Sequence, residues 1–296
     1  MIRKENKVDD YRDDNAWLMM GDCLDRMKEI PDESVDVVMS DIPYGIDFSQ
    51  WDVTHDNKNS ALLGASPAQS KSAVFKTRGK PKNGWSAADA TRSEEFQSFC
   101  KVWLAEVYRI TKPCSPLIIM SGRQNQHRFT VAAEDSGFIF KDYLIWDKKS
   151  APFRAQNINK VLQNRGLPEV SGEYRLGCPS PVAEPIIWLF KPYPLGTTIT
   201  DCFIRDSLGC FESSELKSNL IQFPSRVANK RHETEKPVGL FELLVKSFSV
   251  EGHTVLDMFM GSGTTGVACR HLNRKFIGVE VAETYYNVAK DRILSK

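Results

Sequence analysis

The sequence predicts an α/β fold in which a mostly parallel β-sheet is covered by helices on both faces. Short apolar runs alternate with amphipathic stretches along much of the 296 residues, and this alternation favours parallel strands joined by helices. The hydrophobic fraction of 41% is ordinary for a globular protein. Seven apolar runs have the length and composition of strands: residues 16–20, 35–40, 116–121, 142–147, 184–190, 254–258 and 275–281.

Helical patterns lie between several of these strands. In residues 93–112, apolar side chains recur at intervals of three and four, the period of one helix face: Phe96, Phe99, Val102, Trp103, Val107 and Ile110. Residues 237–249 begin with Pro237, a residue favoured in the first turn of a helix. Shorter helices are expected over 23–30 and 266–273.

Residues 46–92 interrupt the alternation of strands and helices. They have hardly any apolar periodicity and are too long for an ordinary connection in a compact domain. The segment follows Tyr44 almost directly and contains the basic residues Lys71, Lys76, Arg78, Lys80 and Lys82. We predict a mobile basic loop beside a functional site. The alternative is a solvated, disordered insertion that makes no contact with substrate.

Composition narrows the class of protein. The formal net charge is only +1, so contact with nucleic acid would need locally clustered Lys and Arg side chains. No apolar run is long enough to span a membrane, and the first residues lack the apolar region of a secretory signal, which predicts a cytoplasmic protein. The seven cysteines are an odd number without a CxxC pair, so neither a disulfide framework nor a metal site is expected.

A glycine-rich turn joins a predicted strand to a helix near the end of the chain. Residues 255–258 have the pattern of a buried strand, and Phe-Met-Gly-Ser-Gly-Thr-Thr follows at 259–265. Glycines at such a turn let backbone amides approach a ligand closely. The absence of a lysine after the glycines disfavours a phosphate-binding P-loop. Glu280 ends the next strand about 20 residues after Phe259, the spacing at which an acidic residue binds the ribose hydroxyls of an adenosine-containing ligand.

A second motif, Asp41-Ile42-Pro43-Tyr44, follows the strand at 35–40. It combines a carboxylate, a backbone turn fixed by Pro43 and the aromatic face of Tyr44. These groups suit a flat heterocycle that carries an amino group. A strand that ends in a proline turn is common on its own, so the motif gains its meaning from the glycine turn later in the chain.

Together these segments resemble the amino-methyltransferases of DNA, which use S-adenosylmethionine. The resemblance is carried by the motif at 41–44, by His-Glu-Thr-Glu-Lys-Pro at 232–237, by residues 255–265, and by Gly278-Val279-Glu280 with Tyr285. In the β group of this family the catalytic motif comes first, the target-recognition region second and the cofactor motif last, which is the order here. The resemblance covers residues 16–50, 93–150 and, most strongly, 215–295.

The resemblance implies a doubly wound, Rossmann-like sheet of seven strands with inserted target-recognition segments. Residues 1–149 would form the catalytic half and residues 236–296 the cofactor-binding half. Residues 150–235, with one sheet strand near 184–190, would recognise the target. This region carries the basic residues Arg154, Lys160, Arg165, Arg175, Arg205, Arg226, Lys230 and Arg231. The alternative for it is a purely structural excursion.

The resemblance also implies roles for single residues toward S-adenosylmethionine. The turn around its methionine part would be formed by Phe259, Gly261, Gly263 and Thr264. Asp257 and Lys236 would serve its charged amino and carboxylate groups. Asp22 would bind the adenine amino group of the cofactor. As an N-cap of the helix at 23–30, Asp22 could serve both purposes at once.

In this family the target is an amino group of a base turned out of double-stranded DNA. Asp41 would accept one of its hydrogens and the backbone carbonyl of Ile42 the other, while Tyr44 would stack on the base. The chain departs from the family pattern at two positions: Ile42 replaces the first proline of DPPY, and Glu233 replaces the first proline of HPTEKP. A carbonyl does not depend on its side chain, and Pro43 keeps residue 42 extended, so methyl transfer is expected to survive.

The aspartate that opens the motif favours adenine N6, whereas cytosine N4 enzymes of the family more often begin with serine. Three alternatives stay open: methylation of cytosine N4, RNA as the substrate, and a catalytically silent protein that binds cofactor and DNA. Double-stranded DNA is the expected partner. A homodimer and a cognate restriction endonuclease are compatible with the sequence, which decides neither.

Overall fold

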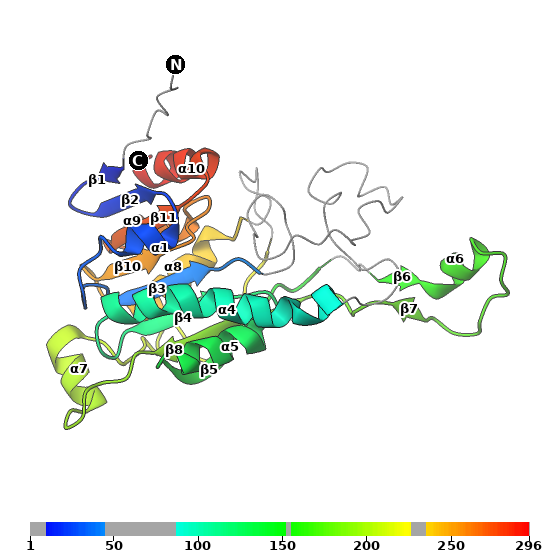
Figure 1. The fold of residues 1–296 in the computed structure, drawn as a ribbon, viewed down its shortest axis with the longest axis horizontal. Coiled ribbons are helices and arrows are strands. Elements are labelled where there is room, and N and C mark those ends of the chain that lie inside the picture. The colour runs from blue at the N-terminus through cyan, green and yellow to red at the C-terminus, as the bar shows by residue number, and fades with distance from the viewer. Residues whose placement is uncertain (1–9, 45–86, 152–154, 226–234, 296) are drawn as a thin grey trace, which may run out of the picture.

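The computed structural model describes residues 10–44, 87–151, 155–225 and 235–295 (Figure 1). Its centre is one nine-stranded sheet within these ranges. The strands stand in the order β1 (Tyr11–Arg12), β2 (Ala16–Met20), β11 (Lys275–Glu280), β10 (Thr254–Asp257), β3 (Val37–Asp41), β4 (Pro116–Met120), β8 (Ala183–Phe190), β5 (Ile139–Asp147) and β9 (Leu220–Gln222). All seven predicted strands are therefore confirmed. The two further strands, β1 and β9, extend the sheet at its edges.

Strand direction decides which residues can meet at one edge of the sheet. The neighbours β2, β11, β10, β3 and β4 run parallel to one another, so their carboxyl ends lie at the same edge. Strand β8 runs antiparallel to both β4 and β5. Its first residues, rather than its last, therefore lie at the edge where the parallel strands end.

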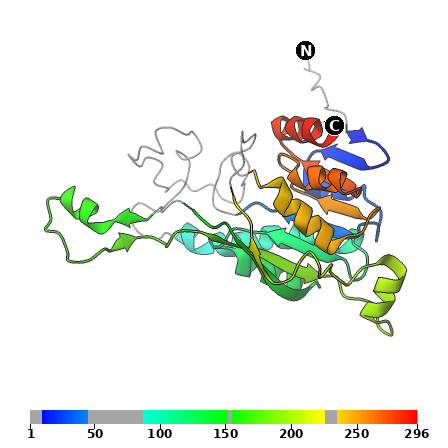
Figure 2. The ribbon, with the colours of Figure 1, turned by 180° about the vertical axis from the view of Figure 1, so that it is seen from behind.

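Helices cover both faces of the sheet, as predicted for a doubly wound fold (Figures 1 and 2). One face packs against α1 (Cys23–Met27), α4 (Ala87–Ile110) and α5 (Gln126–Asp135). The other packs against α8 (Val238–Phe248), α9 (Thr264–His271) and α10 (Glu283–Leu294). Successive strand residues alternate between the two cores, as Leu18 and Met19 do in β2, because side chains on a strand point to opposite faces in turn.

Helix α4 begins earlier than its apolar period indicates. The predicted loop at 46–92 ends too late, because residues 87–92 already belong to this helix. Their sequence, Ala-Ala-Asp-Ala-Thr-Arg, includes three alanines, which favour a helix without needing an apolar face. The prediction of a mobile basic loop, with its five Lys and Arg residues, falls on residues 45–86, outside the described ranges.

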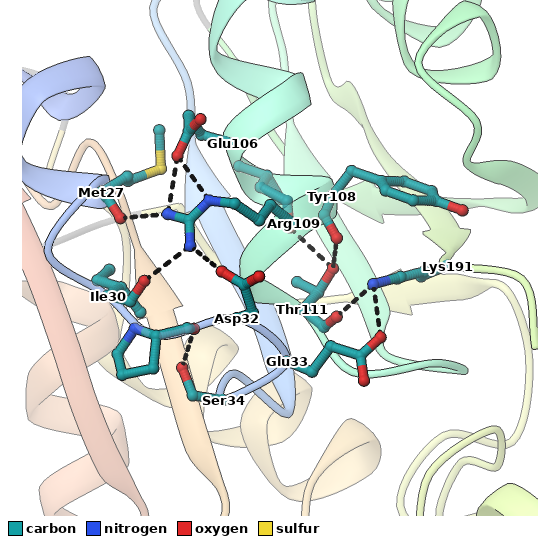
Figure 3. A network of polar contacts seen from close by, with 12 residues as sticks. Met27, Ile30, Asp32, Glu33, Ser34, Glu106, Tyr108, Arg109, Thr111 and Lys191 are labelled. Carbon is teal, nitrogen blue, oxygen red and sulfur yellow. Dashed lines mark hydrogen bonds and ion pairs between the residues drawn. The ribbon is translucent and has the colours of Figure 1, made fainter.

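An arginine network fixes the carboxyl end of α4 to the chain that leads into β3 (Figure 3). The guanidinium of Arg109 donates to the backbone oxygens of Met27, at 2.9 Å, and Ile30, at 3.0 Å. It also pairs with Glu106 and Asp32. The network lies where β3 begins, at the edge of the sheet opposite the carboxyl end of β3. Its role is therefore to stabilise the packing of α4 against the sheet.

Residues 150–235 contribute two kinds of structure. Strand β8 lies inside the main sheet, whereas α6 (Ile158–Gln163), with the paired strands β6 (Gln156–Asn157) and β7 (Arg175–Leu176), projects far from it (Figures 1 and 2). Helix α7 (Ile199–Asp206) lies at the other end of the molecule. In the described part of the chain, no helix combines the length and apolar character needed to cross a membrane.

Candidate active site

The strand order brings the sequence-predicted carboxylates to one edge of the sheet. Four neighbouring strands end near one each: Asp22 follows β2, Glu280 ends β11, Asp257 ends β10 and Asp41 ends β3. From β10 the chain continues through α9 on one face, and from β3 it continues to α4 on the other. Open α/β sheets bind ligands at such a switch point, outside the carboxyl ends of the strands.

The first motif contributes to a cluster of hydrogen-bonded charges. The phenol oxygen of Tyr44 lies 2.8 Å from Oδ1 of Asp41 and 2.9 Å from Oε1 of Glu184. Lys236 donates to the Tyr44 oxygen at 2.9 Å and forms an ion pair with Asp41. Its ammonium is 3.6 Å from Glu184, which is also paired with Lys148. We call these five residues the charge cluster.

The two carboxylates of the charge cluster have opposite pKa shifts. Burial raises the pKa of Asp41 above its ordinary value; Lys236 opposes this rise and the negative charge of Glu184 adds to it. Burial would also raise the pKa of Glu184, but Lys236 and Lys148 together hold it below its ordinary value. The Glu184 side chain is 10% exposed, whereas the Asp41 side chain keeps 23% of its surface exposed. Asp41 is therefore the carboxylate that a substrate can reach.

Ile42 is a core residue with a fixed backbone. Its side chain is 1% exposed and belongs to the core beneath α4. Its amide donates to the carbonyl oxygen of Met120 at 3.0 Å, which continues the pairing of β3 with β4. The half-buried Pro43 follows directly. These contacts preorganise the backbone at position 42 without the proline of the family pattern; the use of its carbonyl as an acceptor stays a prediction.

The chain after β4 supports Tyr44. Asn125 donates from Nδ2 to the Tyr44 carbonyl oxygen at 2.9 Å. A Cβ atom at Gly122 would lie 2.9 Å from the Tyr44 Cβ and 3.0 Å from its Cγ. Only glycine leaves room for the aromatic ring at this position.

We therefore expect the substitution Gly122→Ala to displace Tyr44 and to lower kcat by about 100-fold, because a shift of about 1 Å at a reacting group can have an effect of this size. Melting temperature should be measured together with the rate of the methyl transfer that the sequence resemblance implies. Gly252→Ala is the control for a general loss of stability, since Gly252 has φ +81° and precedes β10 away from the site, and a Cβ there meets no described atom within 4 Å. A Gly122→Ala chain with wild-type kcat would show that the position of Tyr44 does not matter.

The two glycines of the later turn have different reasons to be glycine. Gly263 has φ +79°, and a Cβ there would lie 2.9 Å from the Ala289 Cβ of α10. Gly261 has φ +50°, and among the described residues beyond its chain neighbours a Cβ would meet only the Phe259 carbonyl oxygen, at 4.0 Å. Gly263 thus permits close helix packing, whereas Gly261 borders open space that a ligand can enter.

Glu280 is held by this turn. Its Oε2 accepts the amide of Gly261 at 2.9 Å and its Oε1 accepts the amide of Ala282 at 2.8 Å. Burial raises the pKa of Glu280, while these amides oppose the rise. Each carboxylate oxygen has a second lone pair that can accept a further hydrogen bond. Two such acceptors suit the two hydroxyl donors of a ribose.

Asp257 links the two motifs through a buried carboxylate. It accepts hydrogen bonds from Ser40 at 2.6 Å, from Thr265 at 2.5 Å and from the Phe259 amide at 3.1 Å. Burial raises the pKa of Asp257 to about 6. Because Ser40 directly precedes Asp41, this carboxylate connects strand β3 to helix α9. Direct contact of Asp257 with a cofactor amino group stays a prediction.

The remaining predicted residues flank the same edge. The carboxylate of Asp22 caps α1 by accepting the Leu24 amide at 2.8 Å, so the N-cap role is confirmed. Phe259 packs edge-on against Trp103, with ring centroids 5.5 Å apart. Thr264 begins α9 and is 7% exposed.

Two functional elements were missed from the sequence. One is Glu184, whose place becomes evident only when β8 is seen to run antiparallel. The other is a buried ion pair, in which Arg292 of α10 contacts Glu235 at 2.9 Å and donates to the Ser262 carbonyl oxygen at 2.6 Å. This pair connects the glycine turn to the residue that precedes Lys236. No local sequence pattern marks either contact, since each joins distant segments.

A family model described as DNA methylase, for N6 and N4 methyltransferases, matches residues 35–291. The chain belongs to this DNA methyltransferase family. The match includes both motifs and the region between them, so it covers the site described above apart from Asp22 and Arg292.

Relatives of this methyltransferase support the assignment. The chain is 40% identical over 287 residues to the type II methyltransferase M.HindIII of Haemophilus influenzae, which covers 92% of this chain and 93% of the relative. It is 25% identical to the type II methyltransferase M.HpaI of Haemophilus parainfluenzae, over 94% of this chain and 74% of the relative. The predicted family is therefore confirmed.

Solved structures share the fold. The PvuII DNA methyltransferase, described as cytosine-N4-specific, superimposes with a TM-score of 0.63 at 16% identity, over 97% of this chain and 89% of that one. The M1.HpyAVI–SAM complex gives a TM-score of 0.57 at 19% identity, over 95% and 100% of the chains. These likenesses confirm the predicted fold class.

Proposed function

We propose that this DNA methyltransferase transfers the methyl group of S-adenosylmethionine to the N6 amino group of an adenine that is turned out of double-stranded DNA. The observation that carries the proposal is the Ser40–Asp257 hydrogen bond of 2.6 Å. It ties the strand that ends in Asp41 to the strand that leads into the glycine turn. A group held by the turn and a base held by the charge cluster therefore lie at neighbouring strand ends.

The residues at the turn fit S-adenosylmethionine. Open space beside Gly261 admits a ligand next to the backbone, and the fixed carboxylate of Glu280 suits ribose hydroxyls. Asp22 follows the neighbouring strand, where the Gly21 amide donates to the Glu280 carbonyl oxygen at 2.9 Å, and suits an adenine amino group. Phe259, Gly263, Thr264, Asp257 and Lys236 complete the proposed set. When bound, the cofactor supplies an electrophilic methyl group.

The charge cluster suits the activation of an aromatic amine. Such an amine is a poor nucleophile because its lone pair is conjugated with the ring. Asp41 would accept one amino hydrogen and the Ile42 carbonyl a second, so that the lone pair turns toward the methyl group while Asp41 stabilises the positive charge that develops. Tyr44, fixed by its hydrogen bonds, would stack on the base and recover about 1–3 kcal/mol of the cost of turning it out.

The choice of adenine is supported by the aspartate that opens the motif. Incubation of the purified chain with methyl-labelled S-adenosylmethionine and duplex DNA, followed by hydrolysis to nucleosides, tests it. We expect the label in N6-methyladenine. Label only in 4-methylcytosine would overturn the choice of base. In a parallel incubation with RNA, label in RNA together with none in DNA would overturn the choice of nucleic acid. If no nucleoside carries the label although the chain still binds the cofactor, a catalytically silent binding protein would be supported.

Residues 150–235 are proposed to recognise the DNA sequence. The β6–α6–β7 excursion projects beyond the edge at which the site lies (Figure 1), and it carries Lys160, Arg165 and Arg175, which suit contacts to phosphates and bases. The type II relatives support a link to a restriction endonuclease of the same specificity. A homodimer stays a prediction.

Glu280 offers a direct check of the cofactor assignment. We expect the substitution Glu280→Gln to raise the Kd for S-adenosylmethionine by about tenfold or more. Glutamine has one acceptor oxygen in place of two, so it cannot accept from the Gly261 and Ala282 amides and from both ribose hydroxyls at once. Calorimetric titration measures this directly. Glu283→Gln, at an exposed position in the first turn of α10, is the matched control. Equal affinities of both variants would remove Glu280 from the cofactor site.

A further inference from the structure

Lys236 has two carboxylates within reach, and only one of them is exposed to substrate. The ammonium is paired with Asp41 and lies 3.6 Å from Glu184. The side chains of Lys236 and Glu184 are each 10% exposed, so both charges need a partner inside the protein. As long as Lys236 stays on Asp41, it occupies the acceptor that the target amino group requires.

Glu184 is placed to take Lys236 from Asp41. Its Oε1 faces both the ammonium and the Tyr44 hydroxyl, at 2.9 Å from the latter. Lys148 holds the other oxygen of Glu184 in an ion pair. A small movement of the ammonium between two preformed carboxylates would keep the buried charges balanced.

Tyr44 couples the two carboxylates. Its hydroxyl accepts a hydrogen bond from Lys236 and can donate its single proton to only one of Asp41 and Glu184 at a time. When a base amino group approaches Asp41, the hydroxyl can donate to Glu184 instead. The phenyl ring need not move during this exchange, because Asn125 and Gly122 hold its backbone and Cβ.

We propose that Glu184 is a positioning residue that receives the Lys236 ammonium and the Tyr44 hydroxyl when the target base engages Asp41. This inference rests on the proposed methyl transfer. Glu184 touches no reacting atom and acts through Lys236 and Tyr44. It thereby frees the acceptor and keeps the aromatic ring in place.

The substitution Glu184→Gln tests the proposal. Without the second carboxylate, Lys236 stays on Asp41, so kcat at saturating cofactor and DNA should fall by about 10- to 100-fold. The pKa of Asp41 should fall as well, because the charge of Glu184 raises it. The acid limb of the kcat profile should therefore move to lower pH. Glu184→Asp keeps the charge and should restore part of the rate.

Lys148→Met should move the acid limb the other way. Once Lys148 is absent, Glu184 attracts Lys236 more strongly, Asp41 loses part of its counter-charge and its pKa rises. The groups that face Asp41 in these experiments are Lys236, Glu184, Tyr44 and, through a weaker charge interaction, Asp257. Opposite shifts from two variants of one ion pair are not expected from a general loss of stability.

The control is Asp135→Asn, which removes an exposed carboxylate at the end of α5 that pairs with Lys101 on α4. Melting temperatures of all variants identify any that fail to fold. If Glu184→Gln fails to fold, the direction in which Lys148→Met moves the acid limb of the kcat profile decides the test. If the wild type is active and Glu184→Gln has the same kcat and the same acid limb as the wild type, this inference is wrong and the proposed function stands. A wild type that transfers no methyl group to DNA would overturn the proposed function and this inference with it.

Discussion

Replacement of Asp41 by alanine is expected to lower kcat by about 1,000-fold while S-adenosylmethionine binds as tightly as before or more tightly. The loss follows because the amine loses both its hydrogen-bond acceptor and the charge that stabilises its developing positive charge. Binding is retained because the glycine turn and Glu280 are unchanged, and it can become tighter because a negative charge at the neighbouring strand end is removed while Lys236 keeps Glu184 as a partner 3.6 Å away. Single-turnover methyl transfer and calorimetric titration measure the two quantities separately.

The matched control is Asp25→Ala, which removes an exposed carboxylate in the first turn of α1 that pairs with Lys28. That variant should keep both rate and affinity, since exposed ion pairs contribute little. If Asp41→Ala retained more than about a tenth of the wild-type rate, the assignment of Asp41 as the acceptor of the amino group would be wrong.

Replacement of Arg292 by methionine is expected to produce the largest loss of stability, about 3 kcal/mol in the free energy of unfolding. The substitution leaves the Glu235 carboxylate buried without its guanidinium, and the side chains of Arg292 and Glu235 are only 6% and 4% exposed. For a chain of this size, the loss corresponds to a fall of about 6–12 °C in melting temperature. Urea and thermal unfolding of the purified chain provide the measurement.

A double substitution separates the buried charge from other effects. Glu235→Gln combined with Arg292→Met should be more stable than Arg292→Met alone, because the double variant has no buried carboxylate from which a guanidinium has been removed. Arg270→Met is the control, since Arg270 is 38% exposed and lies 3.6 Å from Asp13. Equal losses from Arg270→Met and Arg292→Met would mean that the buried pair has no special role.

Much of the sheet could be predicted because each central strand is buried on both faces. Residues 254–257 and 275–280 are short apolar runs with no period of their own, which is typical of parallel strands. The strands β1 and β9 have two and three residues and are too short to carry a period. The start of α4 at Ala87 was missed because its first turn has no apolar face.

The site was predictable where the chemistry is local. Asp41 and Tyr44 stand three residues apart, and their hydroxyl–carboxylate contact follows from the turn that Pro43 imposes. Gly261 follows one strand and Glu280 ends the next strand of a single βαβ unit, whose spacing is regular. Lys236 could be placed near the site only through its family motif, and its pairing with Asp41 became visible in the fold.

Glu184 could not be predicted, for a physical reason. If β8 ran parallel to β4, a carboxylate at its beginning would lie at the edge of the sheet away from the site. The apolar pattern of a strand does not indicate its direction. The antiparallel pairing of Met120 with Ile186 places the beginning of β8 next to Tyr44. Arg292 was missed for a related reason, since a buried cation on a helix becomes meaningful only through the distant carboxylate that it meets.

The most direct test of the account is a crystal structure of the chain with S-adenosylhomocysteine bound. We expect the ribose hydroxyls to contact Glu280, the amino-acid part to lie along residues 259–264, and the sulfur to face Asp41 and Tyr44. A ligand bound away from the glycine turn, or one whose sulfur points away from Asp41, would contradict the claim that the two motifs form a single site.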